Sequence, residues 1–435
     1  MSGLESQNRI DPKQAEIPRE SRSKNRRRKV TTEGEAANGF GSVKDVFIEN
    51  FSGNLERDGA ALAVYHKGAL VVDLWGGVAD RAAGSLWNRD TLASIVCCTK
   101  GIASICIAMM VDRGECSYSD KVVKFWPEFG SNNKQDITIE MILTHRAGMP
   151  YFDAEFNLNE ITKDSMAKII EAELPKYPPG SKTQYHAVTF GWLIDQIFSR
   201  IDKKHRTVGE FFREEVHGKY NVEVYIGCSE EQESRLAKFP QAKKGLVLRE
   251  YIHDRKIFTI GAHLSKRPTV GVSRMQASNE IVDLFNNRDV RTIAQAALSG
   301  VATARGLART FQLVMDGSLI SNDLLQRISK PQYCNEFDHA LGKEESKGYG
   351  FVYTKSSTGS WQIGHPAVGG QCVYMDPVNN VVVCYLTNGV KSWAGDYPLC
   401  FSNLQMKIYE AIANIGLQSS DVFINSPPVN KTHTT

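Results

Sequence analysis

The chain has 435 residues, 42% of them hydrophobic and 23% charged, which is ordinary for a globular protein with a large core. Its formal net charge of +3 is too small to indicate a nucleic-acid or membrane-surface partner. No apolar run approaches the roughly 18 residues of a membrane span, and the N-terminus lacks the apolar core of a signal peptide.

The first 42 residues are polar and contain a basic run at 24–29, so we expect a disordered tail, with order beginning near Gly39. The basic run around Arg26 leaves a nuclear location open as the alternative to a cytoplasmic one. Acidic residues in the same stretch argue against a mitochondrial transit peptide. The nine cysteines lack zinc-site spacing, which favours reduced, partly buried thiols in an intracellular protein.

Short apolar runs rich in β-forming residues lie near both ends of the expected ordered region. Residues 60–66 and 69–74 predict a hairpin that turns through a Lys-Gly pair. A helical pattern at 400–415 precedes a C-terminal tail at 416–435. Three further runs, separated by turn residues, lie at 361–365, 371–375 and 381–386.

The middle of the chain is predicted to be mainly helical. Thr207 and Glu210 have the spacing of a capping box that opens a helix. Residues 294–314 have the apolar spacing of an amphipathic helix.

Strands that come first and last, with helices between them, predict an α+β fold. We expect one antiparallel sheet, flanked by terminal helices, with a large and mainly helical inserted lobe. This gives one domain at 43–415, in which the sheet takes about 43–90 and 340–415 and the lobe about 95–335. A chain that leaves a sheet, builds a lobe and returns creates a cleft, and clefts of this kind bind ligands.

Residues 91–114, TLASIVCCTKGIASICIAMMVDRG, carry the most informative local pattern. Apolar residues recur at helical spacing after Lys100, and an Arg-Gly pair ends the pattern. Cys97 and Lys100 therefore share one face of the first turn, near the positive end of the helix dipole. Lys100 could accept a proton from a nucleophile at position 97 or supply a positive charge. On spacing alone, a buried small residue beside an extended lysine is the alternative.

This segment resembles the Ser-x-x-Lys region of the β-lactamase-related serine hydrolases. That family includes class C β-lactamases, family VIII carboxylesterases, DD-peptidases and animal β-lactamase-like proteins. Five more segments resemble the family in its own order, so that the resemblance spans about residues 43–415. They are 119–129, 137–149 with LTHRAGM, 179–194 with Tyr185, 302–309, and 364–370 with GHPAVGG. The resemblance implies the penicillin-binding, β-lactamase-like version of the predicted fold.

The resemblance also implies which residues carry chemistry. The implied catalytic residues are Cys97, Lys100, Tyr185 and His365. Taken alone, Tyr185 would be interpreted as a core or cleft aromatic, and His365 as a satisfied histidine at a strand edge. The motif that contains His145 and Arg146 is interpreted as structural, holding a loop. Cys98 points away from position 97 on a helix and is predicted to be core.

Three positions depart from the family pattern. Cys97 stands where the nucleophilic serine is expected, and Ser94 does not replace it because no lysine follows three residues later. Ala187 stands where many members have Asn or Ser. Ala367 stands at a glycine position, where an added methyl group could crowd the strand that docks substrate.

Two classes of function follow. In the first, Cys97 is the nucleophile of a hydrolase that acts on a small ester, amide or peptide through an acyl-enzyme, with the thiolate favoured by the helix N-terminus and the ammonium. In the second, the protein is a pseudoenzyme with a binding, scaffolding or redox-sensing role. Neither class implies a metal or organic cofactor. The expected partner is a small acyl substrate or peptide, with no nucleic acid, and the oligomeric state is left open.

Overall fold

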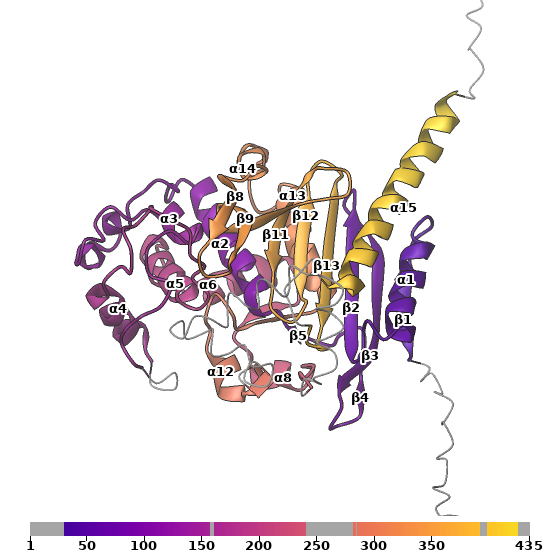
Figure 1. The fold of residues 1–435 in the computed structure, drawn as a ribbon, viewed down its shortest axis with the longest axis horizontal. Coiled ribbons are helices and arrows are strands. Elements are labelled where there is room, and N and C mark those ends of the chain that lie inside the picture. The colour runs from indigo at the N-terminus through magenta and orange to yellow at the C-terminus, as the bar shows by residue number, and fades with distance from the viewer. Residues whose placement is uncertain (1–29, 157–160, 241–281, 284, 392–397, 425–435) are drawn as a thin grey trace, which may run out of the picture.

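Ten strands form one antiparallel sheet, and helices pack on both of its faces (Figure 1). The computed structural model describes residues 30–156, 161–240, 282–283, 285–391 and 398–424. The strand order is β1-β3-β2-β13-β12-β11-β10-β9-β8, with β4 paired to β3. The strands are β1 (Thr32–Ala36), β2 (Gly59–His66), β3 (Ala69–Asp80), β4 (Ser85–Leu86), β8 (Tyr333–Asp338), β9 (Lys343–Gly348), β10 (Phe351–Lys355), β11 (Trp361–Pro366), β12 (Cys372–Asp376) and β13 (Val381–Thr387).

The two distant strand sets meet where β2 pairs with β13, so the predicted single sheet is confirmed. The predicted hairpin is β2–β3, which pairs from Gly59 to His66. Its turn residues Lys67 and Gly68 have φ angles of 51° and 83°. Positive φ at both central positions is the geometry of a type I′ turn, whose twist matches that of the strands it joins.

Side chains alternate between the two faces of the sheet along β2, and each face contacts a different apolar layer. Leu62 and Val64 pack with the terminal helices α1 (Gly41–Ser52) and α15 (Leu399–Ile424), which lie together against one face of the sheet (Figure 1). Ala63 and Tyr65 face the larger core, which contains the inserted helices. Successive side chains of a strand point to opposite faces, so one strand serves both layers.

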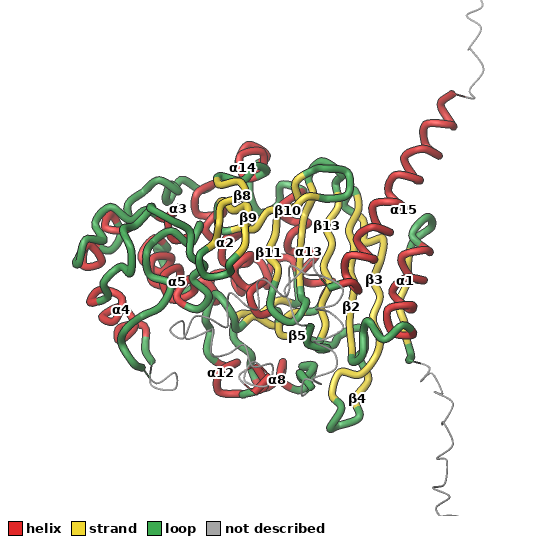
Figure 2. The backbone as a smooth tube through the Cα atoms, viewed as in Figure 1, coloured by secondary structure: helices red, strands yellow, loops and turns green. Residues whose placement is uncertain are grey.

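Helices gather on the side of the molecule opposite α1 and α15 and form the predicted lobe (Figure 2). A small sheet lies within the inserted region, in the order β5-β7-β6 (Ala93–Ser94, Gly300–Ala302, Val224–Ile226). The inserted helices are η1 (Val96–Cys98), α2 (Thr99–Asp112), η2 (Val122–Lys124), η3 (Pro127–Gly130), α3 (Ile139–Leu143), α4 (Lys163–Ala172), α5 (Thr189–Ile201), α6 (Val208–Phe212), the π-helical η4 (Arg213–His217), α7 (Gly218–Tyr220), α8 (Glu230–Glu233), α12 (Arg288–Thr292), α13 (Ala304–Met315) and α14 (Asn322–Ile328).

Thr207 caps α6 as predicted, with its hydroxyl accepting the Glu210 N–H and the Glu210 carboxylate accepting the Thr207 N–H. The prediction of one helix across 294–314 is wrong, because Gly300 lies in β7 and the helix begins only at α13. Pairing of β7 with β5 and β6 overrides the local helical pattern.

The structured region is longer than predicted at both ends. β1 lies inside the stretch predicted to be a tail and pairs with β3 as the edge of the sheet. Its polar sequence, TEGEA, suits an edge strand that faces solvent, so it lacks the apolar signal of an inner strand. At the other end, α15 continues beyond residue 415 to Ile424. The basic run at 24–29 lies outside the described residues.

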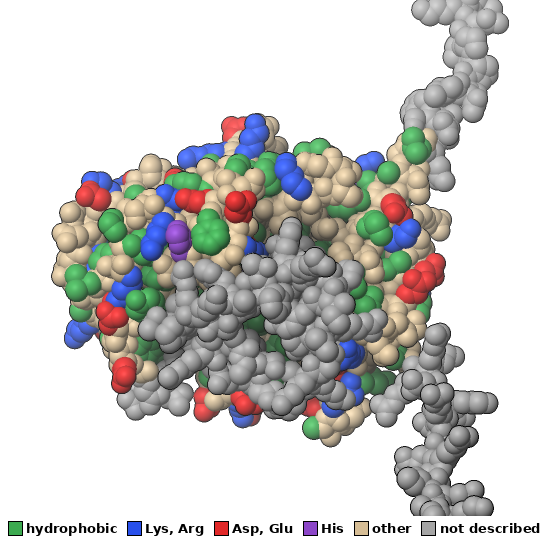
Figure 3. Space-filling view, in the orientation of Figure 1, with side chains coloured by type: hydrophobic (Ala, Val, Ile, Leu, Met, Phe, Trp, Pro, Cys, Tyr) green, Lys and Arg blue, Asp and Glu red, His purple; other side chains and the backbone are tan. Residues whose placement is uncertain are grey.

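Figure 3 shows lysine and arginine side chains interspersed with acidic ones on the visible face, as expected from the small net charge. The nine cysteines form no disulfide bond within the described residues, and eight of them are buried; the exposed one is Cys334. Among the helices of the described residues, none has the length and apolar character needed to cross a membrane.

Candidate active site

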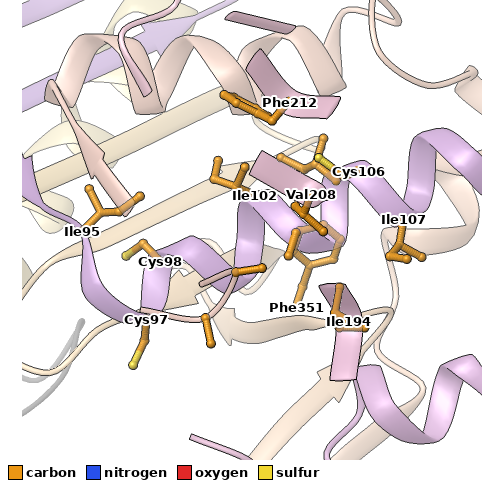
Figure 4. Packing of buried hydrophobic residues seen from close by; sticks show 14 of the residues in the cluster. Ile95, Cys97, Cys98, Ile102, Cys106, Ile107, Ile194, Val208, Phe212 and Phe351 are labelled. Carbon is orange, nitrogen blue, oxygen red and sulfur yellow. The ribbon is translucent and has the colours of Figure 1, made fainter. Parts of the chain in front are cut away.

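The site begins at the turn that joins β5 to α2. Cys97 lies in η1, directly before α2, and is buried with 7% of its surface exposed. Figure 4 shows the Cys97 and Cys98 thiols on different sides of this turn, with Cys97 directed away from the labelled core side chains. Amide N–H groups in the first turn of a helix have no partner within the helix, so this turn offers donors to a negative charge.

The residue before Cys97 has an unusual backbone. Val96 has a φ of 44°, in the left-handed region that β-branched residues rarely adopt. Such a conformation costs on the order of 1–3 kcal/mol, and it persists only where surrounding contacts impose it. Here the Thr99 hydroxyl donates to the Val96 carbonyl at 2.6 Å and accepts the Gly300 N–H at 3.0 Å. The second bond ties the turn to β7.

Lys100 is fully buried on α2, one turn beyond Cys97. Its Nζ donates to the carbonyl oxygens of Ala187 and Ala297, at 2.8 and 3.2 Å, and lies close enough to the Cys97 side chain for the charge of that group to affect its pKa. Burial lowers the pKa of Lys100, although the nearby Cys97 opposes that shift. The amino group therefore lies closer to its neutral form than an exposed lysine does.

Tyr185 lies in the loop that precedes α5, and its side chain joins the same cluster. Lys100 Nζ is 5.0 Å from the centre of the tyrosine ring, and Cys97 is a close enough neighbour to affect the pKa of the tyrosine hydroxyl. Burial raises the pKa of Tyr185 well above its ordinary value, and the neighbouring Cys97 raises it further. The phenol is therefore a neutral hydrogen-bond donor over the physiological pH range.

His365 enters from β11, with its ring 6.2 Å from that of Tyr185. Burial, reinforced by the charge of Lys100, lowers the pKa of His365 to about 3, so the ring is neutral. Its Nδ1 lies 2.7 Å from the Pro366 carbonyl oxygen, which places the ring proton on Nδ1. Nε2 is then an acceptor, and it is buried with no hydrogen-bond partner among the described residues.

The structure thus brings together the residues that the sequence singled out: Cys97, Lys100, Tyr185 and His365. Cys98 lies in the core, as predicted from its helical position, and its thiol donates to the His365 carbonyl oxygen at 3.1 Å. Burial raises the pKa of Cys98 well above that of a free thiol.

His145 lies closer to the site than its interpretation as a loop-holding residue suggested. Its carbonyl accepts the Gln184 N–H at 3.0 Å, and its Nδ1 accepts the His186 N–H at 3.1 Å, so it does hold the tyrosine loop. In addition, the centre of its ring lies 4.5 Å from that of the Tyr185 ring, with the two planes tilted by 53°. Burial lowers the pKa of His145 well below its ordinary value.

The two alanines that depart from the family pattern have definite places. Ala187 serves the site through its carbonyl oxygen, which binds Lys100 whatever side chain stands there. Ala367 is buried just after β11, and its N–H donates to the Gln371 carbonyl at 2.8 Å. In the parts of the chain that the structure describes, no group of three or more His, Cys, Asp or Glu is arranged to hold a metal ion.

Sequence reasoning did not identify two buried charged residues near Tyr185. The Asp338 carboxylate accepts the Tyr185 N–H, and Lys347 pairs with Asp338. Both come from the β8–β9 hairpin, in which neither residue belongs to a motif. The only feature of the sequence that could have indicated them is the unusually polar composition of these two strands, each of which is buried at its C-terminal end.

Comparisons with known proteins agree with this geometry. The beta-lactamase family model matches residues 45–398. The esterase/beta-lactamase LipL of Mycobacterium tuberculosis is 27% identical over 366 residues, which cover 81% of this chain and 82% of that protein. The solved structure of a penicillin-binding protein homologue from Caulobacter crescentus is 26% identical, with a TM-score of 0.72, and covers 88% of this chain and all of that one.

A family VIII carboxylesterase shares the fold, with a TM-score of 0.74 at 24% identity, over 88% of this chain and 100% of that one. The penicillin-binding protein and β-lactamase architecture predicted from sequence is therefore confirmed. The match of the family model runs from before β2 to the start of α15 and includes every residue of the cluster around Cys97. This chain belongs to the beta-lactamase family.

Proposed function

We propose that the protein is a hydrolase of small carboxylic esters, with related amides or peptides as further substrates, and that it forms an acyl thioester on Cys97. The observation that carries this proposal is that Cys97 lies one helical turn before the buried Lys100, whose Nζ is 5.0 Å from the centre of the Tyr185 ring, and that Cys97 shifts the pKa of both residues. A nucleophile next to a base and a second proton-carrying group is the arrangement that acyl transfer requires. The similarity to proteins named as esterases supports an ester as the first substrate class.

Lys100 is the proposed proton acceptor. A neutral amine has two N–H groups, which the carbonyl oxygens of Ala187 and Ala297 accept, and one lone pair, which is left for the Cys97 thiol. Proton transfer converts the thiol–amine pair to a thiolate–ammonium pair in the same geometry.

Acylation then follows in balanced steps. The Cys97 sulfur forms a bond to the acyl carbon while the bond from that carbon to the leaving oxygen or nitrogen breaks. Backbone N–H groups of the first helical turn stabilise the oxyanion. Tyr185, held in its protonated form, donates a proton to the leaving group and regains one from the Lys100 ammonium. Water, activated by the amine, then hydrolyses the thioester and restores the thiol.

A pseudoenzyme with a binding, scaffolding or redox-sensing role is the second candidate. It is favoured by the replacement of the family's serine with Cys97, because a site shaped for oxygen does not automatically suit the larger sulfur. It is also favoured by Ala367, which adds a methyl group just after β11. Under this proposal the cluster keeps its geometry but does not turn over acyl compounds.

Intact-mass spectrometry after exposure to activated esters and a fluorophosphonate distinguishes the two candidates. The proteins are wild type, Cys97→Ala, Cys97→Ser and Lys100→Ala. An acyl adduct on wild type, lost in Cys97→Ala and slowed in Lys100→Ala, is expected for the hydrolase. Labelling seen only in Cys97→Ser would mean that the cluster is intact but that sulfur has silenced it. No adduct on any of the four proteins would favour the binding role.

A further inference from the structure

Asp338 ends β8, fully buried beside the loop that carries Tyr185. Its Oδ1 accepts the Tyr185 N–H at 3.1 Å, together with the N–H groups of Ala340 and Leu341 at 2.8 and 3.0 Å. One carboxylate oxygen therefore joins the β8–β9 turn to the backbone of Tyr185, the residue whose pKa Cys97 affects.

Further contacts hold the same loop against β8. Thr183 and Asp338 form a parallel β-bridge, and His339 donates its N–H to the Thr183 carbonyl at 3.0 Å. Glu336, on the same strand, accepts the Thr183 hydroxyl and pairs with Arg146. Since the loop has no helix or regular strand at this point, these contacts decide where the tyrosine backbone runs.

Lys347 holds the other oxygen of the Asp338 carboxylate. The lysine is 3% exposed, donates to Asp338 and lies 3.0 Å from the Glu345 carboxylate. Its Nζ is also 5.9 Å from the centre of the Tyr185 ring. Two buried carboxylates and a buried ammonium are costly to remove from water, so such a group is weak evidence for a stabilising role. A role in fixing local geometry accounts better for the position of this charged group beside Tyr185.

We propose that Asp338 is a positioning residue for Tyr185, and that Lys347 fixes the Asp338 carboxylate in the orientation that holds the tyrosine loop. Asp338 acts through the backbone of Tyr185 and does not touch the reacting atoms. The inference deepens the proposed function, since it concerns the tyrosine to which that proposal gives a proton-donating role, but the contacts that carry it do not depend on turnover.

The test is the rate of alkylation of Cys97 by iodoacetamide at pH 7, located by peptide mass spectrometry, which needs no hydrolytic activity. Loss of the donor hydroxyl in Tyr185→Phe weakens stabilisation of the thiolate and should lower the rate by about tenfold, the value of one charge-assisted hydrogen bond. Asp338→Ala should lower it by a similar factor. The double variant should be no slower than Tyr185→Phe, because both changes remove one interaction.

Asp202→Asn is the matched control. Asp202 is a buried carboxylate that also pairs with a base, Arg206, and accepts a backbone N–H. It follows the C-terminal end of α5, a helix of 13 residues and about 20 Å that starts beside the tyrosine loop. Its loss should lower stability without changing Cys97 alkylation.

If Asp338→Ala does not fold, Asp338→Asn takes its place, since it keeps an acceptor but turns an amide towards Lys347. The alkylation rate of Cys97 should then fall by a smaller factor. On the Tyr185→Phe background, Asp338→Asn should cause no further decrease. The positioning role would be overturned if Cys97 in either Asp338 variant is alkylated at the wild-type rate. It would also be overturned if the rate decreases caused by the Asp338 and Tyr185→Phe changes are fully additive. Failure of the proposed hydrolysis would instead appear as the absence of acyl adducts on wild type, while the alkylation pattern stays as expected.

Discussion

Two backbone carbonyl oxygens and a thiol surround the amino group of Lys100, and that environment defines what the residue can do. Burial favours the neutral amine, whereas a charged Cys97 favours the ammonium. In the proposed mechanism, charge moves between these two adjacent groups inside one buried site, and little solvent has to reorganise. The two carbonyl oxygens hold the nitrogen in place for that transfer.

Replacement of Lys100 tests this interpretation at the level of one residue. Lys100→Met keeps the length of the side chain but removes the base, so acylation of Cys97 should be slower by a factor of about 10²–10⁴. Lys100→Arg keeps a positive charge but cannot accept a proton, and it should be nearly as slow. The measurement is the rate of adduct formation by intact mass. An arginine variant that reacts at the wild-type rate would show that only positive charge is needed.

At the scale of elements, the strained turn before Cys97 depends on β7. The Thr99 hydroxyl lies between the Val96 carbonyl and the Gly300 N–H, and a Cβ atom at position 300 would be only 2.5 Å from that oxygen. Glycine is therefore required in β7 by the close approach of Thr99, the first residue of α2. The small sheet holds the turn around Cys97 in place, although β7 follows Cys97 by some two hundred residues.

Thr99→Val tests that connection with little change of shape. It removes a hydroxyl whose two partners are buried, so the free energy of unfolding should fall by about 1–3 kcal/mol, as measured by urea denaturation. Relaxation of Val96 should also slow the acylation of Cys97. Thr99→Ser, which keeps the hydroxyl, should restore the acylation rate. If Thr99→Val is acylated as fast as wild type, the hydrogen bonds of the Thr99 hydroxyl do not position Cys97 for acylation.

The fold could be predicted from the sequence because its strands and buried helices carry strong periodic signals. The hairpin β2–β3 and the start of α2 lie where expected, and the spacing of Cys97 and Lys100 follows from one helical turn. β7 could not be predicted, since its three residues continue an amphipathic pattern and only pairing with β5 and β6 makes them a strand. Asp338 and Lys347 lie far from Tyr185 in sequence, so their contact with it follows from the register of the β8–β9 hairpin and the path of the loop.

At the scale of the whole molecule, buried ionisable groups link stability to pH. His145, His186 and His365 are all fully buried, and burial lowers the pKa of His186 to about 4 and that of His365 to about 3. Burial also lowers the pKa of His145 well below its ordinary value. Asp195 has the opposite relation to pH, because burial raises the pKa of its carboxyl to about 7.

The signs of these contributions differ. A histidine whose pKa is lowered by folding contributes stability above its unfolded pKa of about 6.5, and that stability is lost as the pH falls. From pH 7 to pH 5, protonation of the unfolded chain at His186 and at His365 should each lower the free energy of unfolding by about 2 kcal/mol, and His145 acts in the same direction. Asp195, whose pKa is raised, should add back about 2 kcal/mol over the same interval, because the folded state binds the extra proton. The histidines together outweigh Asp195, so stability should fall towards pH 5.

Urea denaturation of wild type and His365→Gln at pH 7 and pH 5 measures this balance. The variant cannot take up a proton at position 365, so its loss of stability between the two pH values should be smaller by about 2 kcal/mol. His205→Gln, which changes an exposed histidine, should lose as much as wild type. An equal loss in all three proteins would mean that His365 is not held neutral by the fold. The buried ring of His365 would then carry a positive charge, and the roles proposed for Lys100 and Tyr185 would have to accommodate a second cation.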